Sequence, residues 1–320
     1  MSVDGLIAPV SEKRRLYLRA MVAAALGMTA AAHGATPDAA NRASRRIIVL
    51  NWDLTEMLLS LGVTPVGVPA PAWYVSSVVE PPLPPGVVDV GLLFQPNYDL
   101  LYELRPDLLV ITPAHASVRA SFERIAPTLT LGAYTMDPQP YRAMRGEAMT
   151  LARHLGVEAK AEALLNATTG VLAQSRATLD AATPTGGYPA VYVAQLVDDR
   201  HLRVFGTGSM FDEILQTLGL RNAAVTALER GSNGAGLGGS AYIVELDRLA
   251  AAPDARILWI GSGAPGNLAG LQRNPVWRQL PFSQAGRTAT LPVISATGAL
   301  ISVQRFARAV ANAMQSSHVI

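Results

Sequence analysis

Residues 141–179 read YRAMRGEAMTLARHLGVEAKAEALLNATTGVLAQSRATL, and this stretch decides the predicted fold. Its apolar residues recur at helical spacing, with one break at Gly156-Val157, and Pro184-Thr185-Gly186-Gly187 ends the pattern. We therefore expect a long connecting helix between two lobes. The alternative is that these helices cover one face of a single continuous sheet.

Short β-branched runs alternate with helical segments before this stretch. A helix is expected at Glu56–Leu61, capped by Asp53 or Thr55, and two more at 97–105 and 118–125. Strands alternating with helices predict a parallel, doubly wound sheet. The expected strands are Ile47–Leu50, Pro65–Val68, Val87–Val90, Leu108–Ile111 and Thr128–Leu131.

A second α/β block follows the helical stretch. Its expected elements are a strand at Ala190–Leu196, helices at Phe211–Leu218 and Val244–Ala251, a strand at Ile257–Ile260 and a helix at Gly298–Met314. The predicted fold class is α/β, with two doubly wound α/β lobes joined by a long rigid connecting helix. The predicted boundaries are 36–140 for the first lobe, 141–183 for the connector and 184–320 for the second lobe.

The N-terminus reads as an export signal. The arginine pair Arg14-Arg15 precedes a short apolar run, Met21–Ala32, and small residues follow in Ala32–Ala35. This pattern predicts a twin-arginine signal peptide over residues 1–35, since a membrane-spanning helix needs about 20 apolar residues. We expect a soluble mature protein outside the cytoplasm. The alternative is an amphipathic N-terminal helix of a cytosolic protein.

Composition excludes several kinds of partner and chemistry. The chain has 26 basic and 24 acidic residues, and removal of the signal leaves 22 of each, so the mature protein is near neutral. Nucleic acid is therefore not an expected partner, because binding a phosphate backbone needs clustered positive charge. The absence of cysteine excludes disulfides and thiolate metal sites.

Catalytic motifs are weak or absent. Gly261–Gly266 fits the dinucleotide pattern G-x-G-x-x-G after a strand, but no acidic residue follows Asp254 to hold a ribose, and Pro265 removes a backbone donor. No G-x-S-x-G nucleophile motif occurs, and Lys160 lies among charged neighbours. The histidines lack metal-binding spacing. We expect neither an enzyme nor a cofactor, and any metal would arrive already chelated.

Several segments resemble ferric-siderophore periplasmic binding proteins, most closely the ferric hydroxamate (ferrichrome-type) group. The opening Ile48-Val49-Leu50-Asn51-Trp52 and the following Glu56–Val68 carry the first part of the resemblance. It continues over essentially the whole mature chain, at residues 80–84, 89–91, 96–101, 105–107, 124–127, 200–202, 204–206, 247–250 and 275–277.

The resemblance implies a monomeric binding protein with a rigid helical backbone and a shallow cleft between its lobes. The cleft would hold an iron(III)-siderophore complex, and the protein would deliver it in the periplasm to an inner-membrane ABC permease. A stiff connecting helix fits small opening motions better than a wide hinge closure.

The expected pocket departs from the family pattern. The arginine that anchors a hydroxamate falls on Leu93, and its partner tyrosine falls on His115. Aromatic contacts of the second lobe fall near Gly238, Ser295 and Thr297, which are small residues. Losing the arginine removes two charge-assisted hydrogen bonds, so ferrichrome itself is not the expected ligand. Small residues predict a roomier cleft for a bulkier siderophore.

Other polar residues are candidates to replace the lost anchor. Arg203 falls where the family has an apolar cleft residue, and it could supply the guanidinium from the opposite lobe. Gln195 and His115 could donate hydrogen bonds to the ligand. The alternative for Arg203 is a surface ion pair with Asp198 or Asp199.

Three aromatic residues of the first lobe are candidates for an apolar wall. Trp73 and Tyr74 fall on a ligand-facing loop, and Trp52 follows the first strand at the cleft edge of an open α/β sheet. Ordinary packing is the alternative for Trp73, and core burial is the alternative for Trp52.

Two acidic residues are candidates for docking to the permease. Asp99 and Asp247 match positions at which relatives present one carboxylate on each lobe to permease arginines. Such exposed pairs orient partners and raise the association rate more than they add affinity. The alternative is that both are ordinary solvated carboxylates.

Two other functions remain open from the sequence. A binding protein for heme or cobalamin would keep the fold and change the ligand. A secreted α/β enzyme with a cofactor would need a site assembled from scattered residues, and twin-arginine export also carries such enzymes.

Overall fold

The computed structural model describes residues 45–183, 187–228, 241–261 and 265–316. The predicted signal peptide, residues 1–35, lies outside the described residues, as do the glycine-rich stretch Gly231–Gly239 and residues 262–264 of the G-x-G-x-x-G motif. Arg45–Ile320 forms one compact unit. No helix in the described ranges combines the length and apolar character needed to cross a membrane.

The first sheet has five parallel strands in the order β3-β2-β1-β4-β5, so every strand predicted for the first lobe is confirmed. Its central strands are apolar on both faces, as expected when helices cover both sides of a parallel sheet. The bounds are β1 Ile47–Val49, β2 Gly67–Val68, β3 Val88–Asp89, β4 Leu108–Ile111 and β5 Thr128–Thr130.

Short helices connect these strands. They are α3 Trp52–Ser60, α4 Pro71–Ser77, α5 Tyr98–Glu103, the 3₁₀ helix η1 Pro113–Val118, α6 Arg119–Glu123 and the 3₁₀ helix η2 Ala133–Met136. The cap predicted for the first of these helices is wrong. Asn51 caps α3 by accepting a hydrogen bond from the Leu54 N–H at 2.9 Å, which leaves Asp53 free for contacts elsewhere.

The second sheet is mixed and has the order β10-β9-β6-β7-β8. Strands β10, β9 and β6 are parallel, whereas β7 and β8 continue the sheet as antiparallel neighbours. The predicted helix at Val244–Ala251 is wrong in its first part, because Ala241–Glu245, which is rich in aromatic and β-branched residues, pairs with β7 as a strand. The bounds are β6 Val191–Leu196, β7 His201–Phe205, β8 Ala241–Glu245, β9 Arg256–Ile260 and β10 Thr288–Leu291.

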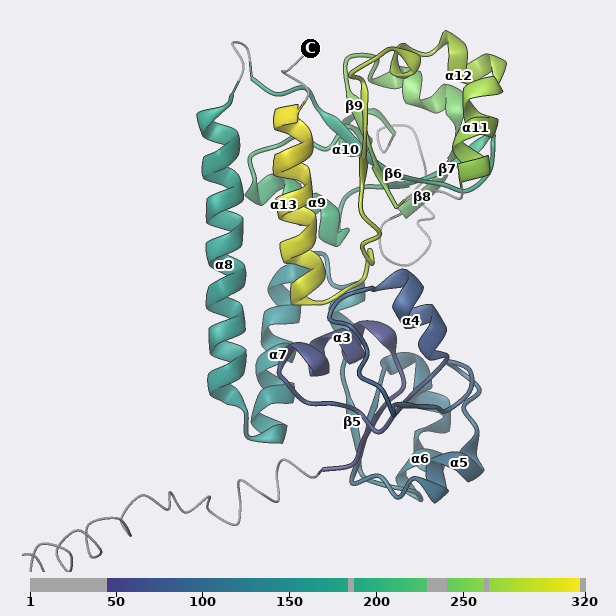
Figure 1. Cartoon of the computed structure of the whole chain (residues 1–320), viewed down its shortest axis with the longest axis vertical. Coiled ribbons are helices and arrows are strands. Elements are labelled where there is room, and N and C mark those ends of the chain that lie inside the picture. The colour runs from purple at the N-terminus through teal and green to yellow at the C-terminus, as the bar shows by residue number, and fades with distance from the viewer. Residues whose placement is uncertain (1–44, 184–186, 229–240, 262–264, 317–320) are drawn as a thin grey trace, which may run out of the picture. The chain divides into compact units, whose positions relative to one another are not determined.

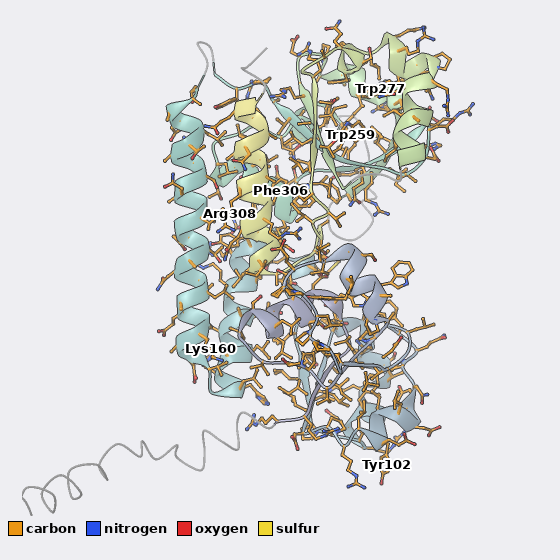
Figure 2. All side chains as sticks on the ribbon, in the orientation of Figure 1. Tyr102, Lys160, Trp259, Trp277, Phe306 and Arg308 are labelled. Atoms are coloured by element: carbon orange, nitrogen blue, oxygen red, sulfur yellow. The ribbon has the colours of Figure 1, made fainter. Side chains whose placement is uncertain are left out.

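The helices of this part pack on both faces of the second sheet. Two tryptophans, Trp259 and Trp277, meet in its core with ring centroids 5.8 Å apart (Figure 2). The bounds are α9 Met210–Thr217, α10 Ala223–Ala227, the 3₁₀ helix η4 Leu246–Ala251, α11 Pro265–Arg273, α12 Pro275–Gln279, the 3₁₀ helix η5 Pro281–Ser283 and α13 Leu300–Ser316.

The stretch between the sheets forms two helices, α7 Pro140–Leu155 and α8 Glu158–Ala181. Gly156 separates them with a φ of +68°, a left-handed conformation that glycine adopts without strain. Helix α8 has 24 residues and is therefore about 36 Å long. It runs beside α7 and α13 (Figure 1). The long connecting helix is thus confirmed, and the alternative of one continuous sheet is wrong.

Helix α8 is not the sole link between the two sheets. Helix α13 packs against α8 and α9 and also touches α3 of the first lobe. One continuous apolar core includes Val110 of the first sheet, Leu258 of the second and Phe306 of α13. Phe306 is labelled in Figure 2. A shared core of this kind resists sliding of one lobe past the other, because interiors pack at the density of crystals.

A cluster of polar side chains, here called the polar junction, joins α3 to the segment before and at the start of α13. The buried carboxylate of Glu56 accepts hydrogen bonds from the Ala299 N–H at 2.9 Å, the Ser302 N–H at 2.8 Å and the Ser302 hydroxyl at 2.7 Å. Asp53 accepts hydrogen bonds from the Ser295 hydroxyl at 2.8 Å and the Thr297 hydroxyl at 2.7 Å. Glu56 thereby satisfies N–H groups that the first turn of a helix leaves unpaired.

Burial raises the pKa of Glu56 from its ordinary 4.5 to about 7, although the hydrogen bonds from Ser302 and Ala299 oppose this shift. The folded protein therefore holds a proton that the unfolded chain releases near pH 4.5. The free energy of unfolding should fall as the pH rises from about 4.5 to 7, by about 3 kcal/mol from this group.

Denaturant unfolding of the wild type and Glu56→Gln at pH 5 and pH 8 measures this contribution, because the variant cannot titrate at position 56. The loss of stability between the two pH values should be smaller in Glu56→Gln by about 3 kcal/mol. Equal pH dependence in the two proteins would contradict the assignment.

Candidate functional site

The first-lobe pocket lies beyond the carboxyl ends of β1, β2 and β3, the edge at which open α/β sheets bind ligands. Its volume is about 420 Å³. The residues that line it are Trp52, Ala70, Trp73, Leu92, Leu93, Phe94 and Gln95. Three residues predicted as ligand contacts, Trp52, Trp73 and Leu93, are therefore brought together in one site.

Two tryptophans form a stacked pair on one side of this pocket. The rings of Trp52 and Trp73 lie 5.8 Å apart between centroids, with their planes inclined by 9°. The Trp52 indole N–H donates to the Pro69 carbonyl at 2.7 Å, which fixes the orientation of its ring. Trp73 is 62% exposed, so a large part of the pair remains available to a ligand.

The loop from Gly91 to Pro96 supplies the other large side chains of the lining, Leu92, Leu93 and Phe94. The N–H groups of Leu92 and Gln95 each donate to the carbonyl of the other at 3.3 Å, and Gly91 and Pro96 form a bridge at the base of the loop. Leu92 and Phe94 are more than half exposed. Sequence analysis missed both residues. The signal that could have identified them is a run of three large apolar residues held between glycine and proline.

His115 supports this loop and does not face the ligand, which corrects the prediction that it donates a hydrogen bond there. Its side chain is buried, and its Nδ1 accepts a hydrogen bond from the Thr112 N–H at 3.2 Å. The hydrogen therefore sits on Nε2, which donates to the Leu93 carbonyl at 2.9 Å. The ring packs between Phe94 and Phe122, so both its nitrogens and its faces are already occupied.

The prediction that Tyr74 forms part of the ligand wall is wrong. Tyr74 lies on α4 beside Trp73, but its side chain points into the core and is fully buried. Its hydroxyl donates to the Pro81 carbonyl at 2.6 Å, and burial raises the pKa of the phenol. Neighbouring residues on a helix point in different directions, so only one of the two aromatics reaches the pocket.

Ser295 and Thr297 belong to the polar junction. Both hydroxyl hydrogens are directed to Asp53, and the Thr297 carbonyl accepts a hydrogen bond from the Tyr134 hydroxyl at 3.0 Å. The predicted ligand contact is therefore corrected to a contact between the lobes. Asp53 is more than 240 residues away from both partners in sequence, so no local sequence pattern predicts these hydrogen bonds.

Arg203 and Gln195 are opposite each other on β7 and β6. Arg203 is exposed, and one of its terminal nitrogens lies 3.5 Å from the Gln195 Oε1, a long and weak contact. Within the described residues Arg203 forms no salt bridge with Asp198 or Asp199. The Asp198 carboxylate instead pairs with His201 at 2.9 Å and accepts a hydrogen bond from the Arg200 N–H at 2.8 Å. The guanidinium therefore keeps donors for a ligand.

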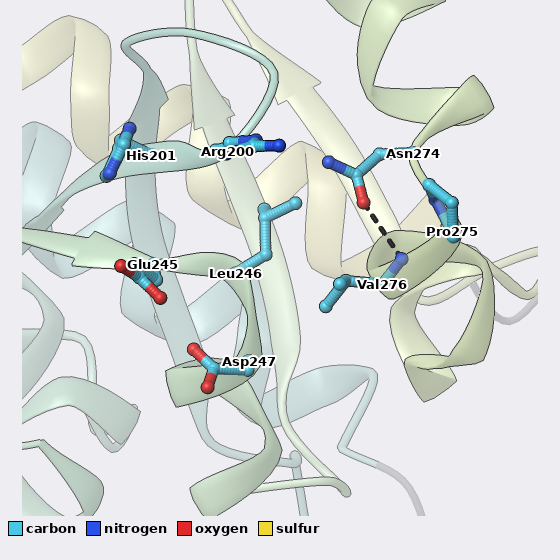
Figure 3. A pocket seen from close by; sticks show the side chains of 8 residues that line it. All are labelled: Arg200, His201, Glu245, Leu246, Asp247, Asn274, Pro275 and Val276. Carbon is cyan, nitrogen blue, oxygen red and sulfur yellow. Dashed lines mark hydrogen bonds between the residues drawn. The ribbon is translucent and has the colours of Figure 1, made fainter.

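The two candidate docking residues are both exposed. Asp99 lies in the first turn of α5, and Asp247 lies on η4. Asp247 lines a second pocket of about 450 Å³ (Figure 3). The other residues that line it are Arg200, His201, Glu245, Leu246, Asn274, Pro275 and Val276. Neither aspartate has a salt bridge to any residue in the described part of the chain.

The described residues contain no group of three or more histidine, aspartate or glutamate side chains that could hold a metal ion. What the first-lobe pocket offers instead is aromatic and aliphatic surface on a fixed frame. Such a surface can bind a preformed ligand through apolar contact.

Replacing His115 with alanine should remove the support of the Gly91–Pro96 loop and destabilise the protein. The variant loses the ring between Phe94 and Phe122 and the hydrogen bond to Leu93, so the free energy of unfolding should fall by about 2–3 kcal/mol. Denaturant unfolding measures the change. The exposed Tyr102→Ala is the control and should stay within about 0.5 kcal/mol of the wild type. Equal stability of the two variants would contradict a supporting role for His115.

The sequence is similar to those of known binding proteins. The sequence model of the periplasmic binding protein family matches residues 47–294. The chain is 31% identical over 309 residues to the iron(3+)-hydroxamate-binding protein FhuD of Escherichia coli (strain K12), covering 96% of this chain and 97% of that protein.

Solved structures show the same likeness. The siderophore-binding protein FhuD from Vibrio cholerae, bound to Fe3+-Desferal, has a TM-score of 0.76 at 27% identity and covers 85% of this chain and 98% of that one. The heme-binding protein RhuT from Roseiflexus sp. RS-1 has a TM-score of 0.64 at 20% identity and covers 86% and 99%. The second match shows a shared fold alone.

Proposed function

Because this chain belongs to the periplasmic binding protein family, we propose that it captures an iron(III)-siderophore complex of the hydroxamate type and delivers it to an ABC permease of the inner membrane. The protein would reach the periplasm through the twin-arginine signal at residues 1–35 and act there as a monomer without catalytic turnover. The observation that carries the proposal is a preformed pocket at the ligand-binding edge of the first sheet in a chain that matches FhuD over nearly its whole length.

Leu93 stands where the family resemblance implies an anchoring arginine, and this changes how the ligand would be held. The side chain offers no donor to the oxygens of a hydroxamate, whereas the exposed guanidinium of Arg203 offers several. We assign the polar contact with the chelate to Arg203 and Gln195 of the second lobe, and the apolar contact to Trp52 and Trp73 of the first. Each lobe would then supply a different kind of interaction.

Ligand binding should quench tryptophan emission, and the chain allows the signal to be located. Of its four tryptophans, Trp52 and Trp73 line the pocket, whereas Trp259 and Trp277 are buried in the core of the second lobe. Titration of the mature protein with a panel of ferric siderophores should give saturable quenching, and Trp73→Phe should reduce its amplitude. Saturable binding of heme or cobalamin with no response to any ferric siderophore would overturn the proposed ligand.

Arg203→Ala should weaken siderophore binding by about ten- to a hundredfold, since a hydrogen bond to a charged group contributes about 1.5–3 kcal/mol. Calorimetric titration measures the affinity. Lys160→Ala removes one positive charge from the exposed surface of α8 and should leave the affinity unchanged (Figure 2). Undiminished affinity in Arg203→Ala would discard the anchoring role.

Docking is testable separately from ligand capture. The double variant Asp99→Asn, Asp247→Asn should stimulate the ATPase of its reconstituted permease less than the wild type does, while its siderophore affinity stays the same. The defect should be larger at low salt, where exposed charges steer association most strongly. Glu162→Gln on α8 is the matched control for loss of an exposed carboxylate. Full stimulation by the double variant would exclude these residues from docking.

A further inference from the structure

We propose that the first-lobe pocket selects ferric chelates that carry an apolar substituent, a hydrocarbon or aryl group, and have no net negative charge. This inference rests on the proposed function and specifies the chemical class of its ligand. The pocket would take up the apolar substituent itself, while the polar face of the chelate turns toward the second lobe.

Several polar atoms around the pocket are already hydrogen-bonded within the protein. The Trp52 indole N–H is bonded to Pro69, and the Leu93 carbonyl is bonded to His115. The N–H groups of Leu92 and Gln95 are bonded within the loop. A ligand oxygen placed against these groups would lose its bonds to water and gain no donor in return, which is unfavourable.

The large apolar side chains of the pocket remain exposed to water, which is unfavourable. Trp73 is 62% exposed, Leu92 is 62% exposed and Phe94 is 61% exposed. Large apolar groups gathered on one surface usually mark a binding site, because water contact with them is unfavourable. Among the side chains that line the pocket, Gln95 and the indole of Trp73 add polar atoms to the bonded Trp52 N–H, and none of the lining side chains is charged.

The pocket is preformed. His115 holds the loop from behind, and the Trp52 ring is fixed by its bond to Pro69. The walls therefore need little reordering to receive a ligand. Because little free energy is lost in ordering them, burial of the ligand's apolar surface contributes more to affinity than it would in a flexible site. A pocket of about 420 Å³ has room for a substituent of several carbons.

A negative charge lies beside the pocket. The exposed carboxylate of Asp89 accepts hydrogen bonds from the Ala70 N–H at 3.0 Å and the Gly91 N–H at 2.9 Å, so it ties together the two strand ends that flank the pocket. A negative charge next to Ala70, which lines the pocket, repels an anionic chelate. With leucine at position 93, the pocket has no guanidinium there to offset this repulsion.

The test compares two ferric trihydroxamates that differ in one group. The first is the ferric complex of Desferal, with its terminal amine free, and the second is the same complex acylated at that amine with a hydrocarbon chain of about six carbons. Calorimetry or tryptophan quenching gives both affinities at low salt and at about 0.5 M salt, where exposed charges are screened. A ferric tris-catecholate serves as the anionic chelate.

The wild type should bind the acylated complex at least about tenfold more tightly, since two buried methylene groups already supply that factor. The preference should persist at high salt, and the tris-catecholate should bind more weakly than either. Trp73→Ala should abolish the preference. Val75→Ala, an exposed residue of the same helix that does not line the pocket, should keep it.

Leu93→Arg tests the inference in the opposite direction. The new guanidinium should raise the affinity for the unacylated complex and reduce the preference for the acylated one. Equal wild-type affinities for the two hydroxamates, or tighter binding of the tris-catecholate, would overturn the inference while leaving the proposed function intact. Binding of heme with no binding of any ferric chelate would instead overturn the proposed function.

Discussion

The capping of α13 by Glu56 is the contact on which the arrangement of the two lobes depends. A buried carboxylate is costly unless strong donors surround it, and the unpaired N–H groups at the start of a helix supply them. Glu56 comes from the first helix of the first lobe, and its partners Ala299 and Ser302 come from the last helix of the chain. Asp53, less than one helical turn earlier, adds bonds from Ser295 and Thr297.

Because of this contact, the polar junction and the connecting helix both limit movement of one lobe relative to the other. Helix α13 packs along α8. The start of α13 is hydrogen-bonded to Glu56 of α3. Arg305 of α13 also forms a salt bridge with Glu80 at 3.1 Å and donates to the Val78 carbonyl at 2.8 Å. Two packed helices and a set of buried polar contacts favour small movements between the lobes over a wide hinge closure.

This stiffness matters for the proposed ligand site. A binding protein whose lobes move little must hold its ligand with surfaces that are already in place. The stacked pair of Trp52 and Trp73 and the loop braced by His115 meet that requirement in the first lobe. Leucine at position 93 then makes apolar contact the main interaction available there, and the exposed Arg203 supplies positive charge from the second sheet.

The sequence by itself determined the α/β class, the five strands of the first sheet, the break at Gly156 and the family. These follow from short-range patterns: β-branched runs, helical spacing, a glycine at a helix end and motifs spread along the chain. The end of the first strand indicates Trp52 in the same way, whereas the family resemblance indicates Trp73 and Leu93.

Only the tertiary structure decided the direction and partners of individual side chains. Tyr74 and Trp73 are adjacent in sequence, but helix geometry buries one and exposes the other. His115 turned inward because Thr112 and Leu93 offered its ring nitrogens matching partners. Ser295 and Thr297 became junction residues because folding brought Asp53 to them across most of the chain. Such pairings depend on contacts between distant segments, and residue type and spacing alone do not contain that information.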